Sequence, residues 1–178
     1  APSLVGSEMC IRDRLIDPAI IGAIASFGIN EVNVIRKPIV SLISTGNELV
    51  MPGEKLNDGQ IYDSNSFAIS AAINSSGAEC KMHKILSDKK EDVDKLYENC
   101  SQSDLIVTIG GVSKGDFDLI RDAISSKGNI DFWGINMKPG KPLAFGKVVL
   151  NNKEVFHIGL PGNPCLLYTS DAADEHGC

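Results

Sequence analysis

The sequence predicts an α/β protein of three layers, in which a mostly parallel sheet lies between two layers of helices. Short apolar runs rich in Ile, Val and Leu alternate with segments of helical periodicity, and turns containing Gly or Pro follow the apolar runs. Strands that alternate with helices form crossover units, so their strands lie parallel and are covered on both faces. Ligands of such sheets bind beyond the carboxyl ends of the strands.

The first half of the chain contains capped helices and short strands. Asp17 and Pro18 are typical of a helix start, and Gly28 is typical of a helix end. The apolar run over 39–43 ends at the Thr45–Gly46 turn, as expected for a buried strand. In order, we expect a helix over 17–28, strands over 31–35 and 39–43, a loop over 51–60, a helix over 62–77 and a strand over 78–86.

The second half contains the most apolar run of the chain, which ends in a pair of glycines. Asn151 and Asn152 are typical of a hairpin turn between two strands. In order, we expect a helix from Asp88 with Leu96 and Tyr97 on one face, a strand over 105–109, a helix over 117–126, and strands over 130–136, 143–145 and 155–158.

Composition excludes several classes of protein. The 178 residues suffice for one core, and 43% hydrophobic with 22% charged residues is typical of a soluble globular protein. No apolar run approaches the roughly 18 residues of a membrane-spanning helix, and the start lacks the pattern of a signal peptide, so we expect a cytoplasmic protein without a membrane partner. The net charge of -6 argues against a nucleic-acid partner.

Cysteine and histidine do not form a recognisable metal site. The five cysteines are widely spaced without a Cys-x-x-Cys pair, and the three histidines are scattered. We therefore expect neither a disulfide framework nor zinc, and interpret His83 and His157 as ordinary strand residues. A metal of this protein would be a hard ion held by carboxylates, such as magnesium.

Glycines and acids follow the predicted strands. Gly110 and Gly111 permit a sharp turn before a helix whose N–H groups attract anions, although taken alone the pair is explained better by a tight turn without a ligand. Asp116 and Asp118 would complement the dipole of that helix or face a magnesium ion that bridges phosphates. Asp63 is explained by an N-cap alone. If Asp63, Glu48 and the other acids converge, their repulsion requires a cation.

Two stiff loops contain lysine and proline. Lys138 and Lys141 are separated by Pro139 and Gly140, and in an acidic chain such constrained lysines can bind an oxyanion, whereas most surface lysines are only solvated. The turn from Pro161 to Pro164 either ends a strand or contributes to the same site.

Taken together, the segments Ser-Thr-Gly-Asn-Glu-Leu from Ser44, Gly-Gly-Val-Ser-Lys-Gly-Asp-Phe-Asp from Gly110, Met-Lys-Pro-Gly-Lys-Pro from Met137 and Leu-Pro-Gly-Asn-Pro from Leu160 resemble the molybdopterin molybdenumtransferases of the MoeA type, which include the E domain of gephyrin. The resemblance extends from Leu15 to Pro164. It implies the molybdopterin-binding domain fold, which is similar to that of molybdopterin adenylyltransferases.

The family's reaction implies a role for each matching residue. Adenylylated molybdopterin and molybdate bind with magnesium, the adenylyl bond is hydrolysed, and molybdenum enters the dithiolene. The resemblance assigns catalysis to Asp63, Asp118, Glu48, Lys138 and Lys141, magnesium binding to Asp63, Asp118, Asp116 and Glu48, and ligand contacts to Gly110, Gly111, Ser113, Ser64, Asn65, Pro161 and Pro164.

Family members are considerably longer, and they are homodimers whose cleft is shared between subunits. The resemblance therefore implies a fragment with half a site, poorly active or inactive alone, from a parent with a possible molybdopterin adenylyltransferase partner. Residues 1–14 and 165–178 resemble translated sequencing-adapter ends, and we expect them to be non-native. We expect 15–38 to lead in from further domains and 39–164 to form the molybdopterin-binding domain.

Two alternatives remain open from the sequence. A stand-alone molybdopterin adenylyltransferase would have a different reaction on the same fold, and would adenylylate molybdopterin when given ATP and magnesium. A non-catalytic scaffold or oligomerisation module would not depend on Asp63 or Asp118.

Overall fold

The structure is a computed structural model, and it describes residues 15–83, 90–110, 125–126, 128–133 and 143–163. The chain divides into two compact units, Ala1–Arg36 and Lys37–Cys178. The helix predicted over 117–126 falls largely outside the described residues, as do the termini that we expect to be non-native.

The first unit contains helix α2, Pro18–Ser26, which begins as predicted. Asp17 is its N-cap and accepts a hydrogen bond from the Ile20 N–H at 2.9 Å, and Gly28 follows the helix with φ +74°. The strand predicted over 31–35 is wrong, because these residues have no regular secondary structure. Their apolar alternation is real, but a strand also needs a neighbour for its backbone groups, and no described strand pairs with them.

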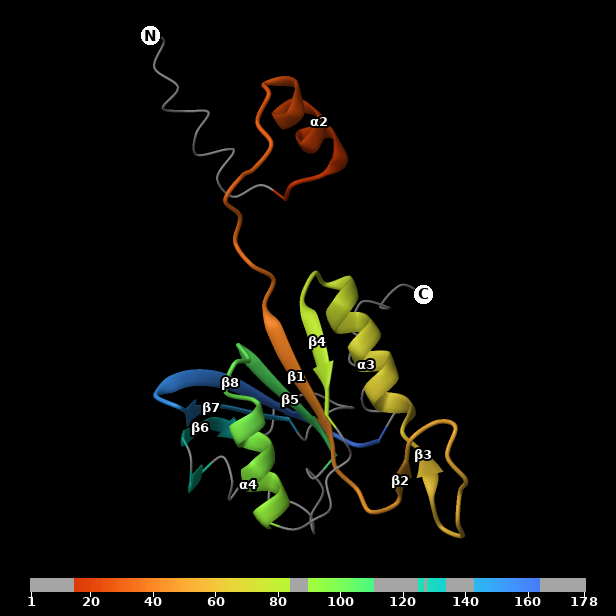
Figure 1. The fold of residues 1–178 in the computed structure, drawn as a ribbon. Helices are drawn as coiled ribbons and strands as arrows, with labels where there is room; N and C mark the ends of the chain where they lie inside the picture. The colour runs from red at the N-terminus through yellow and green to blue at the C-terminus, as the bar shows by residue number, and fades with distance from the viewer. Residues whose placement is uncertain (1–14, 84–89, 111–124, 127, 134–142, 164–178) are drawn as a thin grey trace, which may run out of the picture. The chain divides into compact units, whose positions relative to one another are not determined.

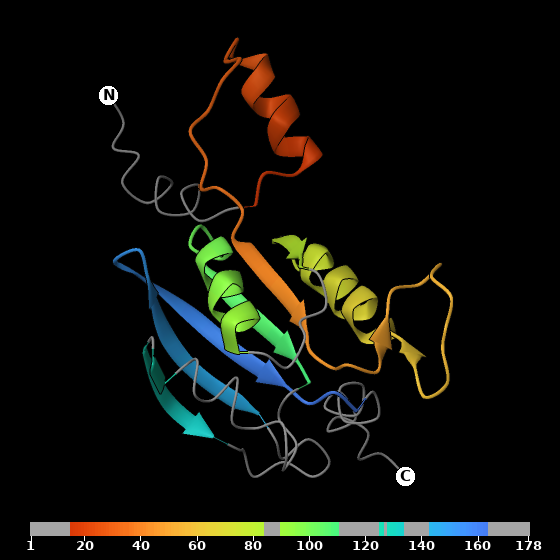
Figure 2. The same ribbon diagram turned by 60° about the horizontal axis from the view of Figure 1, so that its bottom comes forward.

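The second unit is built on a six-stranded sheet, shown in Figures 1 and 2. Its order is β4-β1-β5-β8-β7-β6, and the first four strands are mutually parallel while β7 and β6 are antiparallel to their neighbours. The mostly parallel sheet predicted from the sequence is therefore confirmed. The strands are β1 Ile39–Ser44, β4 Glu79–Met82, β5 Leu105–Ile109, β6 Gly128–Trp133, β7 Ala144–Leu150 and β8 Lys153–Leu160.

Helices α3, Ser64–Ser75, and α4, Lys90–Asn99, supply apolar side chains to two separate clusters on the sheet. Leu96 and Tyr97 of α4 pack with Ile43, Ile106 and other strand residues in one cluster. The second cluster contains Val40, Leu42, Val107 and Ile109, against which Ile69 and Ile73 of α3 pack. Successive β1 residues thus enter different clusters, as expected for a strand buried on both faces.

The β7–β8 hairpin is longer than predicted. Asn151 and Asn152 form its turn with φ values of 50° and 63°, which confirms the predicted turn. Strand β7 continues through Gly146 and Lys147, residues that interrupt the apolar run and so concealed the strand. Its side chains alternate between buried and less buried positions, because one face packs on the core while the other is accessible.

A small parallel pair, β2 Leu49–Val50 and β3 Ile61–Tyr62, flanks the predicted loop and was not expected. Two-residue strands carry no periodicity by which a sequence could reveal them. Their backbone bonds run from the Ile61 N–H to the Glu48 carbonyl at 2.8 Å and from the Asp63 N–H to the Val50 carbonyl at 2.9 Å. They hold the residue that precedes α3 against the segment that follows β1.

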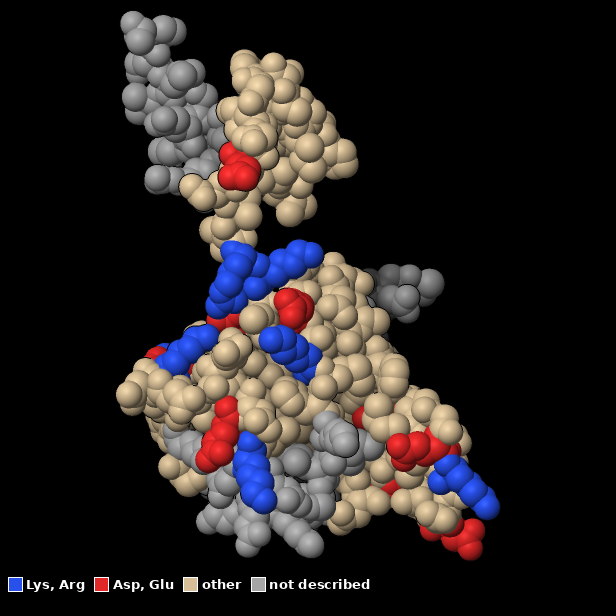
Figure 3. Space-filling model, viewed as in Figure 1, with Lys and Arg blue, Asp and Glu red and all other residues tan. Residues whose placement is uncertain are grey.

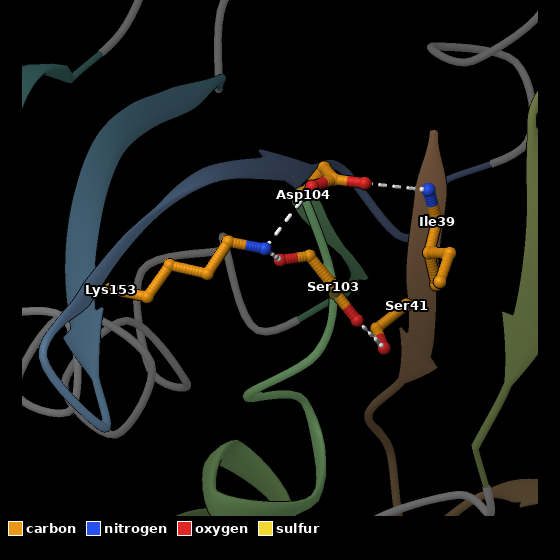
Figure 4. A network of polar contacts seen from close by, with 5 residues as sticks. All are labelled: Ile39, Ser41, Ser103, Asp104 and Lys153. Atoms are coloured by element: carbon orange, nitrogen blue, oxygen red, sulfur yellow. Dashed lines mark hydrogen bonds and ion pairs between the residues drawn. The ribbon is translucent and has the colours of Figure 1, made fainter. Parts of the chain in front are cut away.

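Polar residues join the amino-terminal ends of three strands, as Figure 4 shows. Asp104, just before β5, accepts a hydrogen bond from the Ile39 N–H at 2.9 Å and pairs with Lys153 Nζ at 3.1 Å. Lys153 also donates to the Ser103 carbonyl at 2.9 Å, and the Ser103 hydroxyl bonds that of Ser41 at 2.7 Å. This cluster links β1, β5 and β8 at the edge opposite their carboxyl ends.

The surface in view carries charges of both signs. Figure 3 shows basic and acidic side chains interspersed over the described part of that face. In the stretches that the structure describes, no helix combines the length and apolar character needed to cross a membrane.

Candidate functional site

The carboxyl ends of β1, β5 and β8 lie at one edge of the sheet because these strands are parallel. Each is followed by a segment singled out in the sequence: Thr45–Gly46 after β1, Gly110 after β5 and Pro161–Gly162 after β8. Backbone bonds hold these segments together, from the Thr45 N–H to the Ile109 carbonyl at 3.0 Å and from the Gly110 N–H to the Leu160 carbonyl at 3.0 Å. The starts of three of the four predicted loops therefore meet, whereas the loop from Met137 lies outside the described residues.

Gly110 is required where these loops meet. Its φ is +87°, and a Cβ on it would lie 2.6 Å from the Thr45 carbonyl oxygen, too close for any side chain. A Cβ on Gly162 would in turn lie 3.2 Å from the Gly110 Cα. The two glycines thus allow the backbones after β5 and β8 to approach one another closely, which leaves backbone groups at the edge where a ligand would bind.

Asn65 connects the start of α3 to the same edge. Its Nδ2 donates to the Gly162 carbonyl at 2.8 Å, and its Oδ1 is buried without a hydrogen-bond partner among the described residues. A buried acceptor without a donor is costly, so such an atom ordinarily meets a water or a ligand N–H or O–H. Asn65 therefore offers an acceptor beside three converging loops.

Asp63 is the N-cap of α3 and is 3% exposed. Its Oδ1 accepts from the Ser66 N–H at 3.1 Å, and its Oδ2 accepts from the Ser66 hydroxyl at 2.6 Å. The Ser66 hydroxyl also contacts the hydroxyl of Ser44, the last residue of β1. The N-cap interpretation of Asp63, one of two left open by the sequence, is confirmed.

Glu48 lies in the exposed turn after Gly46. Its carboxylate folds over that glycine, since a Cβ at Gly46 would meet Glu48 Oε1 at 2.7 Å. Among the described residues, no three His, Cys, Asp or Glu side chains are grouped so as to hold a metal ion.

The predicted site residues fall into two sets. Asp63, Ser64, Asn65, Gly110 and Pro161 lie at or beside the shared edge, and Glu48 lies in the turn that precedes β2. The convergence of four acids stays a prediction, because the remaining residues lie outside the described ranges: Gly111, Ser113, Asp116, Asp118, Lys138, Lys141 and Pro164.

Sequence reasoning did not single out Ser44 and Ser66 individually as site residues. An N-cap carboxylate binds the N–H of the third helical residue, so the cap at Asp63 already indicated a contact with Ser66. Nothing in the local sequence indicated that Ser44 would reach the same hydroxyl, because the contact joins a strand to a helix.

Two further titratable side chains lie in the core near α4. Tyr97 bonds His157 Nε2 through its hydroxyl at 3.1 Å, and both are fully buried. Burial lowers the pKa of His157 to about 3, and burial, with a smaller contribution from Cys100, raises the pKa of Tyr97. His157 is therefore neutral near neutral pH and contributes to the core, as its strand position suggested.

Comparison with known proteins agrees with this fold. The model of the family described as "Probable molybdopterin binding domain" matches residues 41–171. The molybdopterin molybdenumtransferase of Haemophilus influenzae is 39% identical over 160 residues, which are 89% of this chain and 39% of that protein.

Solved structures of similar proteins have the same fold. The molybdopterin biosynthesis MoeA protein of Pyrococcus horikosii has 38% sequence identity and a TM-score of 0.74, over 90% of this chain and 39% of the other. The tungsten cofactor synthesizing protein MoaB of Pyrococcus furiosus shares the fold, with a TM-score of 0.56 at 18% identity over 76% of this chain and 89% of that one. The matched part of the chain covers 39% of the length of the Haemophilus influenzae molybdenumtransferase. Because the family model matches most of its length, the chain belongs to the probable molybdopterin binding domain family.

Proposed function

We propose that the edge formed by Thr45, Asn65, Gly110 and Gly162 binds molybdopterin, and that the parent protein inserts molybdenum from molybdate into adenylylated molybdopterin. One observation carries the proposal: residues of separate loops, far apart in sequence, meet at the carboxyl edge of the sheet through close backbone contacts. The names of the similar proteins, molybdopterin molybdenumtransferase and molybdopterin biosynthesis protein, support the choice of ligand.

The edge suits a ligand that carries N–H groups and can lie against the backbone. The Asp63 carboxylate caps the positive end of the α3 dipole, so we assign the anionic end of the ligand to lysines and not to this helix. Asn65 Oδ1 supplies an acceptor that a pterin N–H can satisfy. Gly110 and Gly162 leave room for the ligand to approach the backbone.

The chemistry of the parent protein extends the proposal to residues outside the described ranges. Lys138 and Lys141 are proposed to hold molybdate and the ligand phosphates as fixed positive charges, with Gly111, Ser113 and Pro164 lining the ligand. Magnesium is proposed as the cation, with Asp116, Asp118 and the exposed Glu48 as the acids offered to it. When bound, such an ion offsets phosphate charge.

The proposal for the parent includes its assembly and location. We propose a cytoplasmic homodimer that receives its substrate from a molybdopterin adenylyltransferase. The chain spans 39% of the similar molybdenumtransferase, so we expect it to bind ligand but to turn over little by itself.

The test is a measurement of molybdopterin binding by the chain, in which binding is detected as quenching of the pterin fluorescence. Gly110→Ala introduces a Cβ that meets the Thr45 carbonyl oxygen, and we expect it to weaken binding at least about tenfold. Gly77→Ala is the matched control, since Gly77 has nearly the same φ, +88°, but open space around it. Equal effects of the two variants, or no binding by the unaltered chain, would contradict the proposal. Formation of adenylylated pterin from ATP would favour an adenylyltransferase instead.

A further inference from the structure

The carboxylate of Asp63 does not fit the role of a magnesium ligand. Each of its oxygens directs one of its two lone pairs at Ser66, one to the N–H at 3.1 Å and one to the hydroxyl at 2.6 Å. The side chain is 3% exposed, so the other lone pairs are buried with it. Magnesium demands near-octahedral oxygen ligands and retains several waters, so its ligands must face an open site.

The direction of the hydroxyl bonds follows from counting protons. A serine hydroxyl has one proton to donate. Ser66 uses it on Asp63 Oδ2, so the Ser44 hydroxyl must donate to Ser66. All three side chains are buried. A continuous chain of hydrogen bonds therefore runs from the end of β1, through Ser66, to the N-cap of α3.

This chain of hydrogen bonds holds the segment that contains Asn65. Asn65 lies between Asp63 and Ser66 in the first turn of α3, and it reaches the Gly162 carbonyl at 2.8 Å. The Asp63 N–H is also bound, to the Val50 carbonyl at 2.9 Å. The start of α3 is thus attached to the end of β1 on one side and to the turn after β8 on the other.

We propose that Asp63 is a positioning residue and not a magnesium ligand, and that Ser44 and Ser66 are positioning residues of the same edge. Their role is to hold the first turn of α3, with Asn65, against the loops after β5 and β8. The ligand-binding part of this inference rests on the proposed function, whereas the anchoring of α3 does not.

Anchoring is tested without ligand, by amide hydrogen exchange of the whole chain. Asp63→Ala removes the acceptor of the Ser66 N–H, so we expect exchange in the first turn of α3 to rise at least about tenfold. Asp63→Asn keeps an acceptor for that N–H, and its amide can donate to the Ser66 hydroxyl, which then donates to Ser44. We expect this variant to keep exchange within about threefold of the unaltered chain. Unchanged exchange in Asp63→Ala would overturn the anchoring.

The role of Asp63 in cation binding is tested with Mn²⁺, whose binding is measured from its electron paramagnetic resonance signal. We expect Asp63→Asn to leave the Mn²⁺ affinity, measured with and without molybdopterin, within about twofold of the unaltered chain. A loss of about tenfold or more would overturn the proposal, because a metal ligand loses its charge in this variant whereas a cap does not lose its acceptor.

The role of Ser66 is tested by comparison with Ser76, the serine that caps the opposite end of α3. Ser66→Ala is expected to weaken molybdopterin binding about fivefold to tenfold. Ser76→Ala is the matched control, since the Ser76 hydroxyl donates to the exposed Ala72 carbonyl at 2.9 Å at the far end of α3, and this variant should bind normally. Equal binding by both variants would overturn the role of Ser66. No binding by the unaltered chain would refute the proposed function and leave the exchange test to decide the anchoring.

Discussion

Asn65 Nδ2 donates to the carbonyl oxygen of Gly162 at 2.8 Å, and this bond joins the first turn of α3 to the turn after β8. The two residues are separated by 97 positions in the sequence. Gly162 also approaches Gly110, so the bond links the helix to the loops of two strands. The edge at which we propose that a ligand binds therefore includes a contact between the helix and the far end of the described chain.

Loss of that contact should weaken both ligand binding and folding, whereas loss of a comparable contact elsewhere on α3 should affect folding alone. We expect Asn65→Ala to lower the affinity for molybdopterin about fivefold to tenfold and the free energy of unfolding by about 1 kcal/mol. Asn74→Ala is the control, because Asn74 lies on the same helix and its Oδ1 accepts from the Cys80 N–H at 3.2 Å. We expect the control to lose a similar free energy of unfolding but to bind molybdopterin with normal affinity. Fluorescence titration and urea unfolding measure the two quantities.

The cluster at the amino-terminal ends of the strands should contribute to stability only. Lys153→Met removes a donor to the Ser103 carbonyl and the pair with Asp104, and we expect a loss of about 1 kcal/mol in the free energy of unfolding. Lys147→Met breaks the more exposed pair with Glu154 and removes the ammonium that lies 5.3 Å from the centre of the Phe156 ring, and it should cost about 0.5 kcal/mol. Urea unfolding at low and moderate salt would check this, and an equal loss in both variants would contradict it.

The hairpin turn should be sensitive to branched residues. Asn152 has φ 63°, a region that asparagine tolerates and β-branched residues avoid. We expect Asn152→Val to lower the free energy of unfolding by about 1–2 kcal/mol and Asn152→Gly to change it little. Thermal unfolding of the two variants gives the comparison, and an equally stable Asn152→Val would show that the turn has another conformation.

Buried His157 should make stability depend on pH. Its pKa is lowered to about 3 in the folded chain, so between the ordinary value of 6.5 and about 3 the unfolded state binds more protons. The contribution of neutral His157 to the free energy of unfolding is therefore complete above pH 6.5 and is lost as the pH is lowered. From this group alone, the free energy of unfolding falls by about 2 kcal/mol at pH 5.

His157→Gln removes this titration and should flatten the dependence of the unfolding free energy between pH 7 and 5, even though the variant is less stable at pH 7. His83→Gln is the comparison, since partial burial and Lys81 lower the pKa of His83, which is less buried. An unflattened profile in His157→Gln would mean that other groups cause the acid sensitivity.

Much of the fold follows from local patterns. The run 39–43, the caps at Asp17 and Asp63 and the paired asparagines at 151 and 152 each indicated an element that the structure contains. The strand predicted over 31–35 is wrong because apolar alternation indicates that one face could be buried, but it does not indicate a neighbouring strand for the backbone to pair with. The pair β2–β3 was missed because its strands are too short to show any period.

For the candidate site, the order of the motifs indicated a site at the carboxyl edge, because parallel strands must end on the same side. The ligand that we propose for it, molybdopterin, was indicated only by the family resemblance of those motifs. The motifs left open whether Asp63 caps a helix or binds a cation, since both roles need the same carboxylate at a helix start. The tertiary structure shows the cap and supports our proposal that Asp63 does not bind a cation, because it brings Ser44 from β1 to Ser66 on α3 and encloses Asp63 among their hydroxyl groups. Contacts of this kind join residues that no local pattern connects, and only the tertiary structure sets which lone pairs of a side chain remain available.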